Sequence, residues 1–111
     1  MNAKVYEGTS TSSTKILYTI HNGKIYRGDS TSSSNELSNV KPTGVNIVGG
    51  KVYKGTSTSS SSQLLNVVGE KVYKGTSTMS SSQLANIVGD RLADAEYQRI
   101  LYLIVQRFNL V

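Results

Sequence analysis

The chain has 111 residues, a net charge of +5 and no cysteine. This length suits one domain with a modest core, and the lack of cysteine excludes a disulfide scaffold and a thiolate metal site. The longest apolar run, residues 100–105, falls far short of the roughly 20 residues that span a membrane. Residues 1–4 form no apolar leader, so we expect a soluble cytoplasmic protein.

Four copies of a unit of about twenty residues make up residues 1–90. The copies open at Lys4, Lys24, Lys51 and Lys71, and the third returns almost unchanged in the fourth. Repetition at a fixed period indicates a supersecondary unit that buries its apolar face against its neighbours. We therefore divide the chain into a repeat domain (1–90) and a C-terminal helix (91–111).

Each boundary between copies predicts a β-hairpin. The boundary dipeptides tolerate positive φ and suit two-residue turns; they are Asn22-Gly23, Gly49-Gly50, Gly69-Glu70 and Gly89-Asp90. The register across three of these turns pairs Ile20 with Ile25, Thr19 with Tyr26, Ile47 with Val52, Asn46 with Tyr53, Val67 with Val72, and Asn66 with Tyr73. Because side chains alternate along a strand, one face is aliphatic and the other carries tyrosine beside a short polar residue.

Tracts of serine and threonine separate these hairpins, at residues 9–14, 30–34, 56–62 and 76–82. Their composition is typical of disordered linkers, but their fixed phase predicts an ordered strand end, turn and strand start. The glycine before each tract indicates a bulge or bend. The second copy is longer because of an insertion, residues 38–44, which holds the only proline and predicts a surface loop.

From Asp90 onwards the apolar pattern becomes helical. We expect Asp90 to be the N-cap, with Asp94 and Glu96 near the positive end of the helix dipole and Arg107 near the negative end. The apolar stripe consists of Tyr97, Ile100, Leu101, Ile104, Val105 and Phe108, with Tyr102 and Leu103 off it. Such a helix must be buried in its own domain or against another chain, so the stripe is also the candidate partner contact.

Two architectures fit a repeat of this length. A parallel β-solenoid would stack the four opening lysines about 4.8 Å apart, with a repulsion of about 1 kcal/mol per contact. Antiparallel hairpins avoid this column, so we predict a mainly β, antiparallel hairpin meander of four two-stranded repeats. Pairing of Lys4–Gly8 with Leu84–Val88 would close it into a flower- or propeller-like ring without a free edge. The C-terminal amphipathic α-helix would cap the open apolar end of the ring.

The recurring Ile/Val-Tyr-x-Gly-x-Ser-Thr-Ser signature, followed by a helix rich in Ile and Leu, resembles small bacterial hairpin-repeat proteins described as four-fold β-flowers. The resemblance covers essentially the whole chain. It implies the flower fold and no activity, and no functional residues carry over from it.

The sequence predicts no catalysis, cofactor or metal. His21 is the only histidine and stands where the other copies have Val48, Val68 and Val88. A general base needs an orienting carboxylate and a nucleophile within reach, and the acidic residues do not recur at matched positions. No Gly-rich phosphate loop precedes a helix.

Three non-enzymatic functions remain. The first is an interaction module that presents Ser/Thr loops and Tyr-bearing hairpins to a protein partner or to other copies of itself. The second is multivalent carbohydrate binding of the lectin type, with ligand residues Tyr26, Tyr53, Tyr73, Asn46 and Asn66, although packing between the hairpins explains these tyrosines better. The third is polyanion or nucleic-acid binding through the repeat lysines. We rank them in this order and expect no membrane contact.

Overall fold

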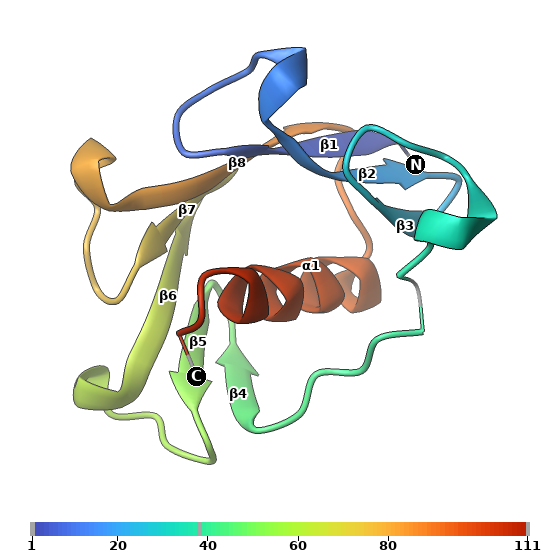
Figure 1. Ribbon diagram of the computed structural model, residues 1–111. Coiled ribbons are helices and arrows are strands. Elements are labelled where there is room, and N and C mark those ends of the chain that lie inside the picture. Colours follow the sequence, from blue (N-terminus) through green and yellow to red (C-terminus); the bar gives the residue numbers. More distant parts are fainter. Residues whose placement is uncertain (1, 38, 111) are drawn as a thin grey trace.

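An eight-stranded antiparallel sheet curls around a single helix in the computed structural model, which describes residues 2–37 and 39–110 (Figure 1). The strands are β1 (Ala3–Glu7), β2 (Ile16–His21), β3 (Lys24–Arg27), β4 (Val45–Val48), β5 (Lys51–Lys54), β6 (Gln63–Val68), β7 (Lys71–Lys74) and β8 (Gln83–Gly89), and the helix is α1 (Asp94–Arg107). The predicted fold class, mainly β with one C-terminal helix, is confirmed.

The tight turns have the predicted register. Ile20 pairs with Ile25, Ile47 with Val52, and Val67 with Val72. Gly49 and Gly69 open their turns with φ near 60°, a conformation that costs glycine little. All neighbouring strands are antiparallel, which excludes the parallel solenoid.

The Ser/Thr tracts are ordered, as predicted. Each contains a short 3-10 turn; the four turns are Ser13–Lys15, Ser33–Asn35, Ser60–Ser62 and Ser80–Ser82. The strand register shifts directly before a tyrosine, between Val52 and Tyr53 for example, and the glycine two residues later adopts positive φ. The expected bulge therefore lies slightly before the glycine, which bends the chain into the tract.

The first and last strands lie side by side, as the ring model required. Lys4 pairs with Val88 and Val5 with Ile87, so β1 takes the position that the next strand of a fifth copy would occupy. Gly89-Asp90 is not a hairpin turn, contrary to the prediction. Instead the Asp90 N–H donates to the Asn2 carbonyl at 2.9 Å, and the Asn2 N–H donates to the Asp90 carboxylate at 2.9 Å.

The predicted closed ring is wrong, because the hydrogen-bonded order β3-β2-β1-β8-β7-β6-β5-β4 leaves β3 and β4 as edges. The break coincides with the insertion, whose residue 38 lies outside the described residues. Just before it, the Leu37 N–H donates to the Ile25 carbonyl at 2.7 Å. After it, the chain resumes as β4 beside β5. The insertion thus splits a strand that is continuous in the third and fourth copies.

Helix α1 lies inside the curled sheet instead of capping one end (Figure 1). Ile100, Leu101, Ile104 and Val105 are fully buried, in one cluster with inward-facing residues of the strands. The helix therefore packs against its own sheet. The burial of Tyr102 and Leu103, both only 7% exposed, was not predicted from their place beside the apolar stripe.

Two hydrogen bonds show what lies beside these two residues on the flanks of the helix. The Tyr18 hydroxyl donates to the Leu103 carbonyl at 3.2 Å. The hydroxyl of Thr43, in the insertion, lies 3.2 Å from that of Tyr102. The sheet covers one flank of the helix and the insertion covers the other.

Helix α1 begins later than predicted. Ala93 is the N-cap, and Asp90 is not. Residues 91–93 are not helical, because they carry the chain from β8 into the concave side of the sheet. The Glu96 carboxylate accepts the Ala93 N–H at 3.1 Å, which satisfies one N–H of the first turn. Among the described residues, no helix has the length and apolar character needed to cross a membrane.

Candidate functional site

The five predicted ligand residues lie on the outer face of the sheet. Asn46 pairs with Tyr53 and Asn66 with Tyr73, while Tyr26 pairs with Thr19. The three tyrosines are only 7 to 8% exposed, so their rings offer little surface to a ligand in this conformation.

The polar partners of these tyrosines hold the Ser/Thr loops. The Asn46 amide donates to the Ser57 carbonyl and the Asn66 amide to the Ser77 carbonyl, both at 3.1 Å. The Thr19 hydroxyl donates to the Gly28 carbonyl at 2.7 Å. Each bond ties a loop to the strand next to the one that it follows. The two asparagines of the predicted set, like Thr19, therefore have a structural use, to keep the loops against the sheet.

The Ser/Thr loops share one hydrogen-bonding pattern. In each of them a serine Oγ accepts the backbone N–H two residues later at 3.0 Å; the pairs are Ser10 and Ser12, Ser30 and Ser32, Ser57 and Ser59, and Ser77 and Met79. Three loops add a hydroxyl pair at 2.9 to 3.0 Å, for example Ser59 with Ser61. Met79 replaces this serine in the fourth loop and is 67% exposed.

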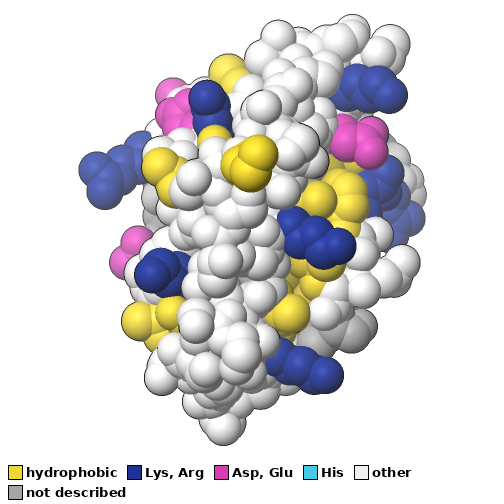
Figure 2. Space-filling model, turned by 90° about the vertical axis from the view of Figure 1, so that its left-hand side faces the viewer, with side chains coloured by type: hydrophobic (Ala, Val, Ile, Leu, Met, Phe, Trp, Pro, Cys, Tyr) yellow, Lys and Arg dark blue, Asp and Glu magenta, His cyan; other side chains and the backbone are white. Residues whose placement is uncertain are grey.

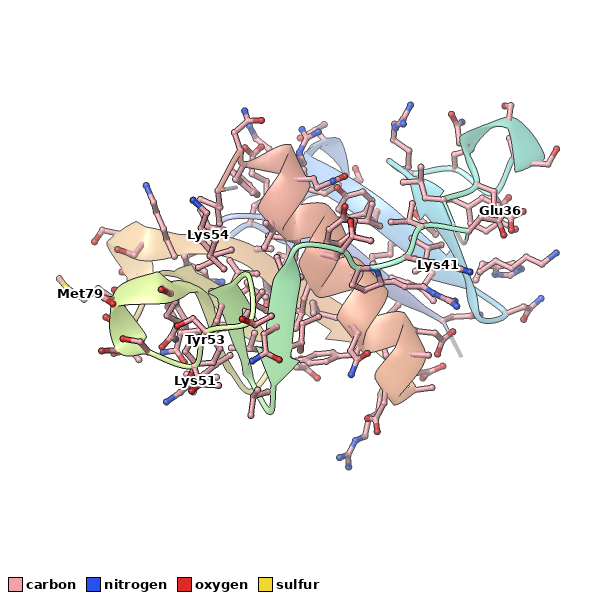
Figure 3. The ribbon with its side chains drawn as sticks, turned by 90° about the horizontal axis from the view of Figure 1, so that it is seen from below. Glu36, Lys41, Lys51, Tyr53, Lys54 and Met79 are labelled. Atoms are coloured by element: carbon pink, nitrogen blue, oxygen red, sulfur yellow. The ribbon has the colours of Figure 1, made fainter. Side chains whose placement is uncertain are left out.

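The opening lysines are separated by the antiparallel order. They lie on β3, β1, β7 and β5, which alternate with other strands, so neighbouring lysines are separated by at least two strand spacings, about 10 Å. Figure 2 shows Lys and Arg side chains dispersed over one face of the molecule, some of them beside Asp or Glu side chains. Figure 3 labels Lys51 and Lys54 at the two ends of β5, and Lys41 in the insertion. Lys4 forms an ion pair with Asp29 at 3.3 Å.

The predicted partner contacts of the helix are mostly buried in the core. Ile100, Leu101, Ile104 and Val105 have no exposed surface, and only Tyr97 and Phe108 are half-buried. Burial raises the pKa of Tyr97. Only the two ends of this stripe are therefore accessible from outside, and its centre is not.

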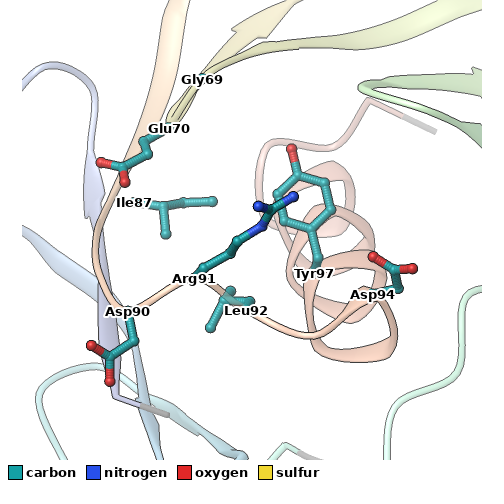
Figure 4. Close-up of a pocket in the computed structure, with 8 residues that line it drawn as sticks. All are labelled: Gly69, Glu70, Ile87, Asp90, Arg91, Leu92, Asp94 and Tyr97. Carbon is teal, nitrogen blue, oxygen red and sulfur yellow. The ribbon is translucent and has the colours of Figure 1, made fainter.

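Tyr97 lines a hollow of about 410 Å³ between the Gly69-Glu70 turn and the start of α1 (Figure 4). Ile87 and Leu92 contribute apolar surface, and Arg91 extends across the hollow between β8 and the helix. Asp90 and Asp94 lie on opposite sides of it, so they do not form a carboxylate pair. Among the described residues, no group of three His, Cys, Asp or Glu side chains is placed to hold a metal ion.

A second hollow, of about 450 Å³, lies on the outer face of β1 and β2. Its polar lining consists of Asn2, Lys4, Tyr6, Thr19, His21, Asp29 and Thr31, and we call it the His21 hollow. Sequence reasoning missed it because His21 and Asp29 belong to different copies. The signal was present, since both residues replace the valine and threonine found in the other copies.

The curled hairpin meander, with its outward loops and buried helix, defines a hairpin-repeat protein of the β-flower kind. Residues 5–108 match the model of a family described as 6-fold beta flower protein. The match spans nearly the whole chain, so the chain belongs to this family. The β-flower resemblance is confirmed, but the family is six-fold where the resemblance was to four-fold proteins. No curated protein and no solved structure matches the chain.

Proposed function

We propose that this protein is a non-enzymatic interaction module that presents its hydroxyl-rich loops to a protein partner or to other copies of itself. The observation that supports the proposal best is the single loop conformation, built four times from the same serine-to-backbone hydrogen bond. A surface that is ordered before binding loses less conformational entropy when a partner docks. Repetition also allows several weak contacts to act together.

The fourth loop adds an apolar contact to this polar surface. Met79 is 67% exposed at the position of Ser12, Ser32 and Ser59. Methionine is flexible and polarisable, so it adapts to irregular partner surfaces. Met79 is therefore the residue through which a partner would distinguish one loop from the other three.

Light scattering across a range of protein concentrations tests the self-association half of the proposal. We expect the average mass to rise with concentration, and the variant Met79→Ser, which restores the serine of the other loops, to weaken this rise. The matched control is Gln98→Ala, an exposed helix residue outside the loops.

Affinity capture with the same two variants tests the partner half. We expect a defined protein to be retained by the wild type and by Gln98→Ala and to be reduced with Met79→Ser. A strictly monomeric protein that retains the same proteins whether or not Met79 is present would contradict the proposal.

Polyanion binding through the repeat lysines is the alternative to the interaction function, and its dependence on salt can be tested. Lys24, Lys51 and Lys71 are exposed, and phosphate contacts make affinity fall steeply with salt. Retention on heparin at physiological ionic strength, lost in a Lys24→Gln, Lys51→Gln, Lys71→Gln variant, would favour this function. Elution well below that ionic strength would argue against it.

A further inference from the structure

Comparison of the four copies shows which residues of the His21 hollow are common to the repeat and which are particular to this hollow. Lys4, Tyr6 and Thr31 recur in every copy, but other lining residues do not, among them Thr19, which is asparagine in the other three copies, and two residues that change the chemistry more. His21 replaces a valine, and Asp29 replaces the threonine found at positions 9, 56 and 76. These two departures come from different copies and meet only in the folded chain, where they line one hollow. The shared positions build the scaffold, and the departures give this hollow its own chemistry.

A charged donor and a charged acceptor lie next to each other in the His21 hollow. The Lys4 ammonium is 3.3 Å from an Asp29 carboxylate oxygen, and the two side chains are 43% and 55% exposed. Lysine only donates hydrogen bonds and an ionised aspartate only accepts them, whereas the Thr31 hydroxyl does both. Their opposite charges largely cancel, so the hollow does not favour a charged ligand.

Tyr6 adds an accessible aromatic side chain. It is half-buried, whereas Tyr26, Tyr53 and Tyr73 are more than nine-tenths buried. An aromatic ring with one polar end packs well on a ligand that has an apolar face and polar edges. The volume of about 450 Å³ lies within the usual range for small-molecule sites, about 300 to 1,000 Å³.

We propose that the His21 hollow binds a neutral sugar. Adjacent hydroxyls of a pyranose each donate and accept, which matches the adjacent Lys4 and Asp29. The ring carbons provide the apolar face that Tyr6 contacts. This site differs from the predicted one, because it uses Tyr6, the accessible tyrosine of the first copy, and Asp29, which the other copies replace with threonine. It goes beyond the proposed interaction function and uses a different surface.

Titration of the ¹⁵N-labelled protein with neutral monosaccharides, followed by NMR, tests this proposal. We expect saturable shifts confined to Lys4, Tyr6, His21 and Asp29 and their neighbours for at least one sugar. A dissociation constant of about 1 mM, equivalent to about 4 kcal/mol, suits a shallow hollow. The variant Asp29→Thr should weaken binding at least tenfold without loss of fold, because threonine occupies this position in the other three loops.

Two controls separate the site from general surface effects. Thr56→Asp places the same carboxylate in the third loop, where the strand residue matching His21 is Val48, and should leave the affinity unchanged. Inorganic phosphate should cause no saturable shift in the hollow. The proposal is overturned if no neutral monosaccharide binds, if Asp29→Thr binds as the wild type does, or if phosphate saturates the hollow. Failure here would leave the Met79 experiments unaffected.

Discussion

Residues of one type take different roles in this chain according to what covers them. Tyr53 was predicted opposite Asn46, and the register is confirmed. Its burial agrees with the interpretation of these tyrosines as packing residues. The bond from Asn46 to Ser57 was not predicted, because hairpin pairing does not reveal it. Tyr18 faces the interior instead, where its hydroxyl reaches the Leu103 carbonyl. Periodicity indicates a face but not the loop that folds over it.

Tyr18 links stability to alkaline pH. Burial raises its pKa, and the positive charges of Arg107 and Arg27 lower it by less. The folded state therefore keeps this proton at a pH where the unfolded state, with a pKa of about 10, has lost it. The contribution of Tyr18 to stability is complete below about pH 10 and is lost as pH rises through the folded pKa.

Urea unfolding of Tyr18→Phe at neutral and alkaline pH measures this link. We expect a loss of about 1 kcal/mol at neutral pH, where the hydrogen bond to Leu103 is removed, and a smaller alkaline decline than in the wild type. Part of the alkaline decline should persist in Tyr18→Phe, because burial also raises the pKa of Tyr97. An unchanged decline would show that Tyr18 does not carry it.

At the scale of elements, the repeat pattern ends after β8, and α1 follows where a fifth copy would begin. The apolar stripe of the helix was predicted from the sequence, but the residue at which the helix begins and its position inside the sheet were not. Residues 91–93 are needed to cross from β8 to the concave face, so the helix starts at Asp94. The helix contributes the most completely buried aliphatic residues outside the strands, so it should be essential to the fold.

Truncation of the helix core tests this role. Ile104→Ala should lower the free energy of unfolding by about 2 to 5 kcal/mol, because it removes buried methyl groups and leaves a cavity. The exposed control Gln98→Ala should change it by less than about 0.5 kcal/mol. Equal effects of the two variants in urea unfolding would mean that the helix is not packed as described.

The pairing of β1 with β8 depends on Gly89. Its φ is 134°, and a Cβ there would lie 2.6 Å from both the Asn2 carbonyl oxygen and the Ala3 Cα. Gly89→Ala should therefore cost about 2 to 4 kcal/mol, from backbone strain and overpacking together. Gly69 also has a positive φ, but a Cβ there would meet no atom within 4 Å. Gly69→Ala should therefore lower the free energy of unfolding by only about 1 kcal/mol, from backbone strain alone. Calorimetric unfolding that ranks Gly69→Ala as the more damaging would contradict this.

At the scale of the whole molecule, the repeats determine a curled sheet and the insertion determines where it opens. The sequence indicated both the pairing of β1 with β8 and a surface loop in the second copy. It did not indicate that this loop divides a strand, because Glu36-Leu37 and β4 each look like ordinary strand ends. Only the aligned copies, in which β6 and β8 run unbroken, show that the divided strand leaves two edges.

Residue-resolved amide hydrogen exchange tests the open ring most directly. Asn46 and Val48 pair with Tyr53 and Lys51 of β5, so backbone alternation turns the N–H groups of Val45 and Ile47 towards the open edge. Their equivalents in the interior strand β6 are Leu65 and Val67, and the Val67 N–H donates to the Gly50 carbonyl at 2.6 Å. We predict that Val45 and Ile47 exchange much faster than Leu65, Val67, Asn46 and Val48. Protection of Val45 and Ile47 equal to that of Leu65 and Val67 would show that the ring is closed.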